Sequence, residues 1–222
     1  MKKILNQSNL KVLIAGLATA FVLYHSHKKY NLSGISLVLL GVLIVLAFVV
    51  VSLMDAKQKQ RILSEQLMET RQLLTKDSEE FLRKNEELYQ RYKDDFLRLN
   101  IISNMIVGYD QKKDYETPLK KMDELNIYRY TRPMKEFYFA TKAMLLFKAG
   151  KDEEAVRLMN SEEEFFENRE EDFSGLGSLF YFDYLKRLAF EGKTEELKKS
   201  LSRTRKKMGN NFLADDFPVE DE

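Results

Sequence analysis

The sequence contains no cysteine, no tryptophan, three prolines and two histidines among its 222 residues. Without cysteine the chain forms no disulfide, holds no metal through thiolates and has no thiol nucleophile. The two histidines, His25 and His27, lie in a short polar segment between two apolar runs. The long polar region that follows therefore lacks His-based acid/base chemistry and a Ser-His-Asp arrangement. The His-x-His pair alone supplies too few ligands for a metal site.

Phosphate-binding chemistry is also missing from the sequence. The only glycine-rich spot, residues 174–178, reads SGLGS and lacks both the dinucleotide-binding and the phosphate-loop patterns. A flexible turn is the simpler interpretation. We therefore expect that the protein is not an enzyme and that it uses no cofactor and no catalytic or structural metal.

Residues 35–54, ISLVLLGVLIVLAFVVVSLM, form a run of twenty residues without a charge. As a helix this run would be about 30 Å long, which matches the thickness of a bilayer's hydrocarbon core. We expect it to span a membrane. The alternative that such a run leaves open is a buried central helix in a soluble fold.

A weaker apolar run precedes it. As a helix, residues 10–27 would be about 27 Å long, just enough to cross a membrane. The basic start resembles that of a signal peptide, but the small-residue triplet 18–20 lies inside the apolar run instead of after it. We therefore expect a retained helix. Residues 1–54 are predicted to form a transmembrane hairpin with spans at about 10–27 and 33–54, whose small residues at 15–20 pack on Gly34, Ser36 or Gly41.

Lysine and arginine residues near the spans predict the orientation, since cytoplasmic flanks carry an excess of both. Both ends outweigh the connecting loop: the flanks carry Lys2, Lys3, Lys11, Lys57, Lys59, Arg61 and Arg71, and the loop carries Lys28 and Lys29. The pattern predicts a multi-pass protein of the cell membrane with both termini in the cytoplasm.

Charge is segregated along the chain, although the net charge is only +1. Residues 1–54 hold lysines and no acid, and residues 209–222 hold acids and no base. The region between is nearly balanced, which gives no pull toward nucleic acid. Residues 209–222 are predicted to be an acidic disordered tail, with a docking motif as the alternative. The acidic run at 161–178 is expected to be a solvated surface, with a patch for a basic partner as the alternative.

Residues 55–80 are rich in good helix formers and are predicted to form a polar helical stalk. Beyond it, apolar positions at helical spacing predict three helix pairs within a domain at residues 81–208. The expected helices are 81–107 with 116–125, 134–149 with 152–160, and 178–191 with 194–207. Gly150 and Gly192 are expected to end a helix in each of the last two pairs, and Asp152 or Thr194 to cap the helix that follows.

The middle pair, MKEFYFATKAMLLFKAGKDEEAVRLM, resembles the tetratricopeptide family. Ala140, Leu145, Gly150 and Ala155 occupy places like those of the small residues between paired helices, within a resemblance that covers residues 95–207. The repeat period, near 40 residues, differs from the 34 of that family. The resemblance implies an α-solenoid that acts as a binding scaffold.

The predicted architecture is thus all-α: a two-helix transmembrane hairpin, a stalk and a tetratricopeptide-like solenoid of about three helical hairpins. Such stacked pairs expose a concave surface that can hold a peptide. Aromatic residues with a hydroxyl suit such a groove because they tolerate water. The candidate partner-binding residues are Tyr128, Tyr130, Tyr138, Tyr181 and Tyr184.

We expect a membrane-anchored adaptor or scaffold of bacterial type whose cytoplasmic domain binds a protein partner. Its other expected partner is the lipid bilayer; nucleic acid is not expected, and self-association is left open. The alternative is an accessory or immunity-type subunit of a membrane transport or secretion assembly that acts through its transmembrane hairpin.

Overall fold

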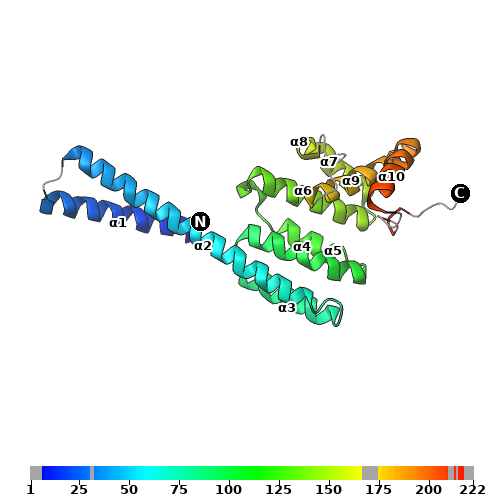
Figure 1. The fold of residues 1–222 in the computed structure, drawn as a ribbon, viewed down its shortest axis with the longest axis horizontal. Coiled ribbons are helices and arrows are strands. Elements are labelled where there is room, and N and C mark those ends of the chain that lie inside the picture. Colours follow the sequence, from blue (N-terminus) through cyan, green and yellow to red (C-terminus); the bar gives the residue numbers. More distant parts are fainter. Residues whose placement is uncertain (1–6, 31–32, 167–174, 210–212, 214, 218–222) are drawn as a thin grey trace, which may run out of the picture. The chain divides into compact units, whose positions relative to one another are not determined.

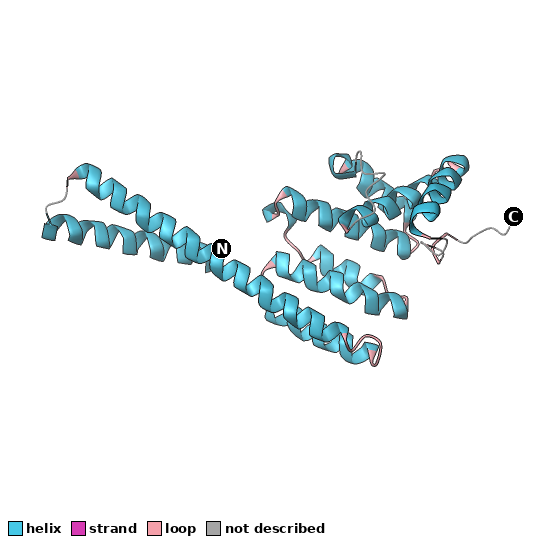
Figure 2. Ribbon diagram, viewed as in Figure 1, coloured by secondary structure: helices cyan, strands magenta, loops and turns pink. Residues whose placement is uncertain are grey.

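The computed structural model describes residues 7–30, 33–166, 175–209, 213 and 215–217. Within these ranges every regular element is a helix and none is a strand (Figure 2). The all-α prediction is therefore confirmed for this part of the chain. Contacts between Cα atoms divide the chain into two compact units, Met1–Glu65 and Gln66–Glu222.

The first unit contains helix α1 (Gln7–Tyr30) and most of helix α2 (Gly34–Arg71) (Figure 1). Among the described residues, α2 is the one helix long and apolar enough to cross a membrane. Many apolar side chains of its membrane-length run are exposed, as expected for a surface that lipid would cover; Leu39, Leu43 and Val51 are each at least 60 % exposed.

Helix α1 extends further than the sequence predicted. The predicted span ended at about residue 27, and the polar segment that contains His25 and His27 continues the helix to Tyr30. His27, Lys28 and Lys29 form its basic last turn, where cations are favoured by the partial negative charge of the helix C-terminus.

The second unit begins with the end of α2 and continues through helices that pack on their neighbours in the sequence. Helix α3 packs on α4, α4 on α5, α5 on α6, α6 on α7 and α9, and α9 on α10 (Figure 1). The bounds are α3 Ser78–Arg91, α4 Asp95–Lys112, α5 Glu116–Asp123, the 3₁₀ turn η1 Ile127–Arg129, α6 Arg132–Lys148, α7 Asp152–Ser161, α8 Glu163–Phe166, α9 Leu176–Phe190 and α10 Thr194–Met208.

The predicted single helix 81–107 is two helices in the structure. Helix α3 ends at Arg91, and Tyr92 and Asp94 are extended. The Asp94 carboxylate accepts a hydrogen bond from the main-chain N–H of Leu97 at 3.1 Å, so it caps the N-terminus of α4. This cap starts a new helix where neither proline nor glycine marks a break.

The two predicted glycine turns are present. Gly150 and Gly192 have φ of 71° and 69°, values that glycine adopts without steric cost. At each turn the residue after the glycine donates its main-chain N–H to a carbonyl five residues earlier, at 2.9 and 3.0 Å. The expected side-chain caps are absent, because Lys151 and Lys193 hold the cap positions and make no side-chain cap bond.

A buried cluster of polar side chains connects α2, α3 and α4 at the start of the second unit. Asn104 of α4 donates hydrogen bonds to Oδ1 of Asn85 in α3 at 2.8 Å and to Oγ1 of Thr70 in α2 at 3.3 Å. Arg71 Nε donates to Asn104 Oδ1 at 2.7 Å. Thr70, within the predicted stalk 55–80, is only 6 % exposed, so the packed unit begins before residue 80.

Candidate functional site

Three of the five candidate partner-binding tyrosines lie in the core. Tyr130, Tyr138 and Tyr181 are at most 8 % exposed. Their hydroxyls donate to main-chain carbonyls of Asp95, Met122 and Ser200 respectively. A buried tyrosine whose hydroxyl is satisfied in this way contributes to packing, and a partner reaches it only if the helices move apart.

The other two candidates are accessible. Tyr128, in the 3₁₀ turn η1, is 91 % exposed. Tyr184 of α9 is partly exposed, and its hydroxyl donates to Glu196 of α10 at 2.8 Å. The five tyrosines do not form one cluster: Tyr130 contacts Tyr138 and Tyr181 contacts Tyr184, each with ring centroids 6.2 Å apart. A partner-binding role for Tyr128 and Tyr184 stays a prediction.

The structure contains a surface site that the sequence did not single out. A segment of the chain's own tail occupies this site. Asp216 and Phe217 belong to the predicted disordered tail 209–222, yet both contact helices of the second unit. We call the four residues that hold them, Lys148 of α6, Phe182 and Lys186 of α9, and Arg205 of α10, the tail site. Helices α6 and α9 pack on each other, as do α9 and α10, which brings these side chains together.

Electrostatic contacts hold Asp216. Its Oδ1 lies 3.7 Å from Lys148 Nζ and 3.9 Å from Lys186 Nζ. Lys186 Nζ also donates to the main-chain carbonyl of Asp216 at 3.3 Å. All three side chains are between 20 and 23 % exposed, so water screens these contacts less than it would at a fully open surface.

Phe217 is held by its ring and its main chain. The side chain is 8 % exposed, and its ring meets that of Phe182 edge to face with centroids 6.4 Å apart. Lys186 Nζ lies over the Phe217 ring at 4.7 Å from its centroid, a cation–π distance. Arg205 Nη2 donates to the Phe217 carbonyl. The tail site thus binds a carboxylate, an aromatic ring and a main-chain carbonyl, which belong to two consecutive residues.

Asp110 of α4 positions Lys148. Lys148 Nζ donates to Asp110 Oδ1 at 3.2 Å, and the Tyr115 hydroxyl donates to the same oxygen at 2.6 Å. Burial alone would raise the pKa of Asp110, but these two hydrogen bonds and the Lys148 charge outweigh it, so the pKa lies below its ordinary value. Asp110 is therefore ionised at neutral pH and holds the ammonium group near the tail.

A hollow of about 270 Å³ lies between α5, α6 and α7. Its rim carries two ion pairs, Lys142 with Asp123 at 2.6 Å and Lys151 with Glu116 at 2.5 Å. Because these cations are already matched by acids, the hollow offers little net charge to a ligand. Among the residues that the structure describes, no group of three or more His, Asp or Glu side chains could hold a metal ion.

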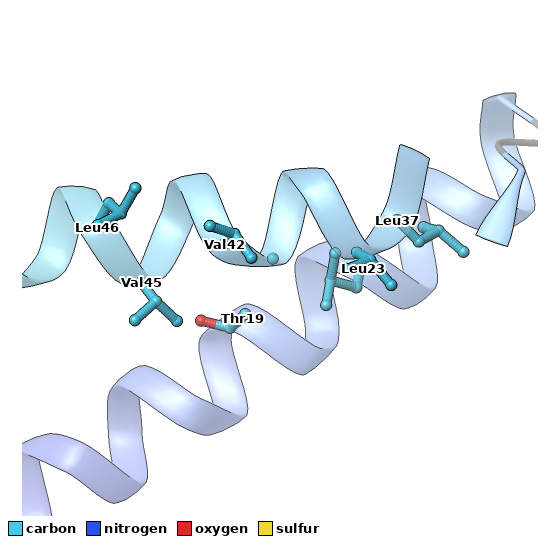
Figure 3. Close-up of a pocket in the computed structure, with 8 residues that line it drawn as sticks. Thr19, Leu23, Leu37, Val42, Val45 and Leu46 are labelled. Atoms are coloured by element: carbon cyan, nitrogen blue, oxygen red, sulfur yellow. The ribbon is translucent and has the colours of Figure 1, made fainter. Parts of the chain in front are cut away.

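The first unit contains an apolar hollow of about 480 Å³ between α1 and α2. Figure 3 shows the side chains from both helices that border it. Its lining is Thr19, Leu23, Leu37, Val38, Gly41, Val42, Val45 and Leu46. Gly41 faces Leu23, since a Cβ at position 41 would lie 3.5 Å from Leu23 Cδ1. Of the other small residues in the predicted contact, Thr19 borders the same hollow, whereas Gly16 and Gly34 face open space.

Asp183 of α9 is fully buried, and neither carboxylate oxygen has a hydrogen-bond partner. Burial raises the pKa of this carboxyl well above its ordinary value. The sequence carries a signal for it, a single acid inside the apolar run LFYFDYL, although helical periodicity by itself does not single out this position. Within the acidic run at 161–178, residues 167–174 lie outside the described part of the chain.

In comparisons with protein-family models, with curated proteins and with solved structures, nothing matched this chain.

Proposed function

We propose that the protein is a membrane-anchored adaptor whose second unit binds a protein partner at the membrane surface. The observation that carries this proposal is the tail site, where Lys148, Lys186 and Arg205 hold the Asp216–Phe217 segment. A surface that holds a carboxylate, a buried phenylalanine and a main-chain carbonyl together has the elements of peptide recognition. Its contacts combine partly exposed charged groups with a buried aromatic pair, the two kinds of contact that protein interfaces contain.

The anchoring part of the proposal is supported by α2. Its apolar length fits one crossing. The proposal adds α1 as a second, less apolar crossing, and the excess of Lys and Arg outside the connecting loop favours a hairpin with both termini in the cytoplasm. The binding part extends the resemblance to tetratricopeptide proteins: about three helical hairpins, α4 with α5, α6 with α7 and α9 with α10, would stack as a solenoid. The connections at Gly150 and Gly192 are short, and consecutive pairs pack on one another, as that arrangement requires.

The test uses site-specific photo-crosslinking in native membranes. A benzoylphenylalanine residue in place of Tyr128 or Tyr184 puts a reactive ring at an exposed aromatic position of the second unit. We expect each to give an adduct of defined mass with one protein, and Lys199, an exposed position on α10, to give none. Loss of adducts at both tyrosine positions would overturn the adaptor proposal.

The apolar hollow between α1 and α2 favours a second candidate, an accessory or immunity-type subunit of a transport or secretion assembly. Leu23, Val42 and Leu46 border a space that a helix of another membrane protein could fill. Replacing residues 34–54 by an unrelated apolar span separates the two candidates. Adducts from Tyr128 and Tyr184 persist if the protein is an adaptor, and they disappear if the hairpin itself recognises the assembly.

A further inference from the structure

We infer that the partner carries an acidic residue directly followed by phenylalanine, and that this motif binds the tail site in place of the chain's own Asp216–Phe217. The inference rests on the proposed adaptor function and names the chemistry of its partner. The tail segment shows what fits: a carboxylate between two ammonium groups, a ring against Phe182 and a carbonyl on Arg205.

Removal of the tail would leave side chains of the tail site without their present contacts. Asp216 is the carboxylate that pairs with Lys186, and its main-chain carbonyl accepts from the same ammonium group. Phe182, now 4 % exposed, would lose the ring that covers it. Lys148 would keep Asp110, so a cationic, aromatic surface would remain in a fixed geometry. Such a surface attracts a segment with the opposite charge and an apolar ring.

Another segment can replace the tail because the side chains of the tail bind the site weakly. The ion pairs are partly exposed, and ion pairs of this kind contribute little. Phe217 supplies the main apolar contact. Tethering raises the effective concentration of the tail to roughly the millimolar range, and this keeps the site occupied when no partner is present. A partner that repeats the motif and adds contacts beyond it can therefore displace the tail.

The charge pattern also explains why the partner should be acidic. The tail site presents three cations, and Asp110 is bound to only one of them. Asp215, immediately before Asp216, is exposed, so an acid at that position is tolerated and adds to the attraction at longer range. The binding should accordingly weaken as salt concentration rises.

The test measures binding of a fluorescein-labelled peptide, NNFLADDFPVEDE, which copies residues 210–222. It is added to the full chain in detergent micelles, either wild type or the open variant with Asp216→Ala and Phe217→Ala, and fluorescence anisotropy is recorded. We expect the open variant to bind the peptide at least about tenfold more tightly than wild type, because its own tail no longer competes. A peptide with alanine in place of its phenylalanine at 217 should not bind.

Two charge reversals in the open variant locate the site. Lys186→Glu should reduce peptide affinity about tenfold or more, and Lys199→Glu, an exposed lysine on α10 outside the tail site, should leave it unchanged. Circular dichroism confirms that each variant keeps its helices. If Phe217→Ala unfolds the chain, the milder Asp216→Lys variant, which keeps the ring, replaces it. Equal affinity for wild type and open variant, or no effect of Lys186→Glu, would overturn the inference.

Two further outcomes are informative. A concentration-dependent dimer of the wild-type chain that disappears with Phe217→Ala would mean that tails exchange between copies, and the site would then belong to self-association instead of a partner. Failure of peptide binding together with intact crosslinking from Tyr128 and Tyr184 would remove this inference and leave the adaptor proposal standing. Loss of both crosslinks would remove the adaptor proposal itself.

Discussion

The Nδ2 atom of Asn104 donates a hydrogen bond of 2.8 Å to Oδ1 of Asn85, and both side chains are almost completely shielded from water. Asn85 Nδ2 in turn donates to the main-chain carbonyl of Phe81 at 2.8 Å. This pair fixes how α3 and α4 align, because shifting either helix along its axis would leave a buried amide without a partner.

Replacing Asn104 with leucine should lower the free energy of unfolding of the second unit by about 1–3 kcal/mol, because Asn85 Oδ1 and Arg71 Nε each lose a hydrogen bond to Asn104. The double variant Asn85→Leu/Asn104→Leu should lose less than the sum of the two single changes, since it leaves fewer unpaired amides. Urea unfolding of the four chains measures this coupling. Strict additivity would show that the two amides act independently.

Gly108 allows α4 to lie close to α3. A Cβ there would lie 2.9 Å from two ring atoms of Phe81, a side chain with no solvent exposure. Gly108→Ala should therefore lower the unfolding free energy by about 1–2 kcal/mol, even after the gain in helix propensity that alanine brings. Gln111→Ala, on the exposed side of the same helix, is the matched control and should change stability by less than about 0.5 kcal/mol.

Asp183 predicts an unusual pH dependence. Its folded-state pKa is raised by burial, so at pH values above its unfolded-state pKa, near 3.9, the folded chain holds a proton that the unfolded chain releases. Its contribution to stability therefore falls as pH rises from that point toward the folded-state pKa.

Asp183→Asn removes this titration. The variant should be more stable than wild type by about 1–3 kcal/mol at pH 8, and the difference should shrink toward pH 4. Thermal unfolding followed by circular dichroism at several pH values measures the difference between the two chains, in which the effects of all other carboxyls cancel. A constant difference across this range would mean that Asp183 is ionised in the folded chain.

The tyrosines give a paired prediction. Tyr181→Ala should destabilise the second unit by about 3–5 kcal/mol, because the side chain is 1 % exposed and packs between α9 and α10. Tyr128→Ala should change stability by less than about 0.5 kcal/mol, since the side chain is 91 % exposed. If Tyr128 binds a partner, its replacement should weaken partner crosslinking from Tyr184 without any loss of folding.

The helices and their order could be predicted because apolar periodicity and glycine punctuation are local signals. Gly150 and Gly192 end helices where the sequence predicted, and the apolar run at 35–54 lies within a single helix. The break before Asp94 was missed because an aspartate cap inside a run of helix formers is a weak signal beside proline or glycine.

The tail site was beyond prediction for a different reason. Lys148, Lys186 and Arg205 come from three helices, and each is an ordinary basic residue in its own sequence context. Only the packing of α6 on α9 and of α9 on α10 brings them to one place, and only then does the acidic tail have a partner. Asn85 and Asp183 are intermediate between the helices, which local signals predict, and the tail site, which depends on packing. Each is a polar residue within an apolar stripe, and such a residue can be recognised in the sequence.

Gly150 and Gly192 share the same backbone geometry, and each is followed by Lys-x-Glu-Glu at the start of the next helix. Joining Gly150 directly to Lys193 would rebuild the same turn, so a protein engineer could remove or duplicate a whole helical module at this junction and keep its local hydrogen bonds. The length of this unit is thus adjustable in steps of one helical module, without a redesign of the turns that connect the modules.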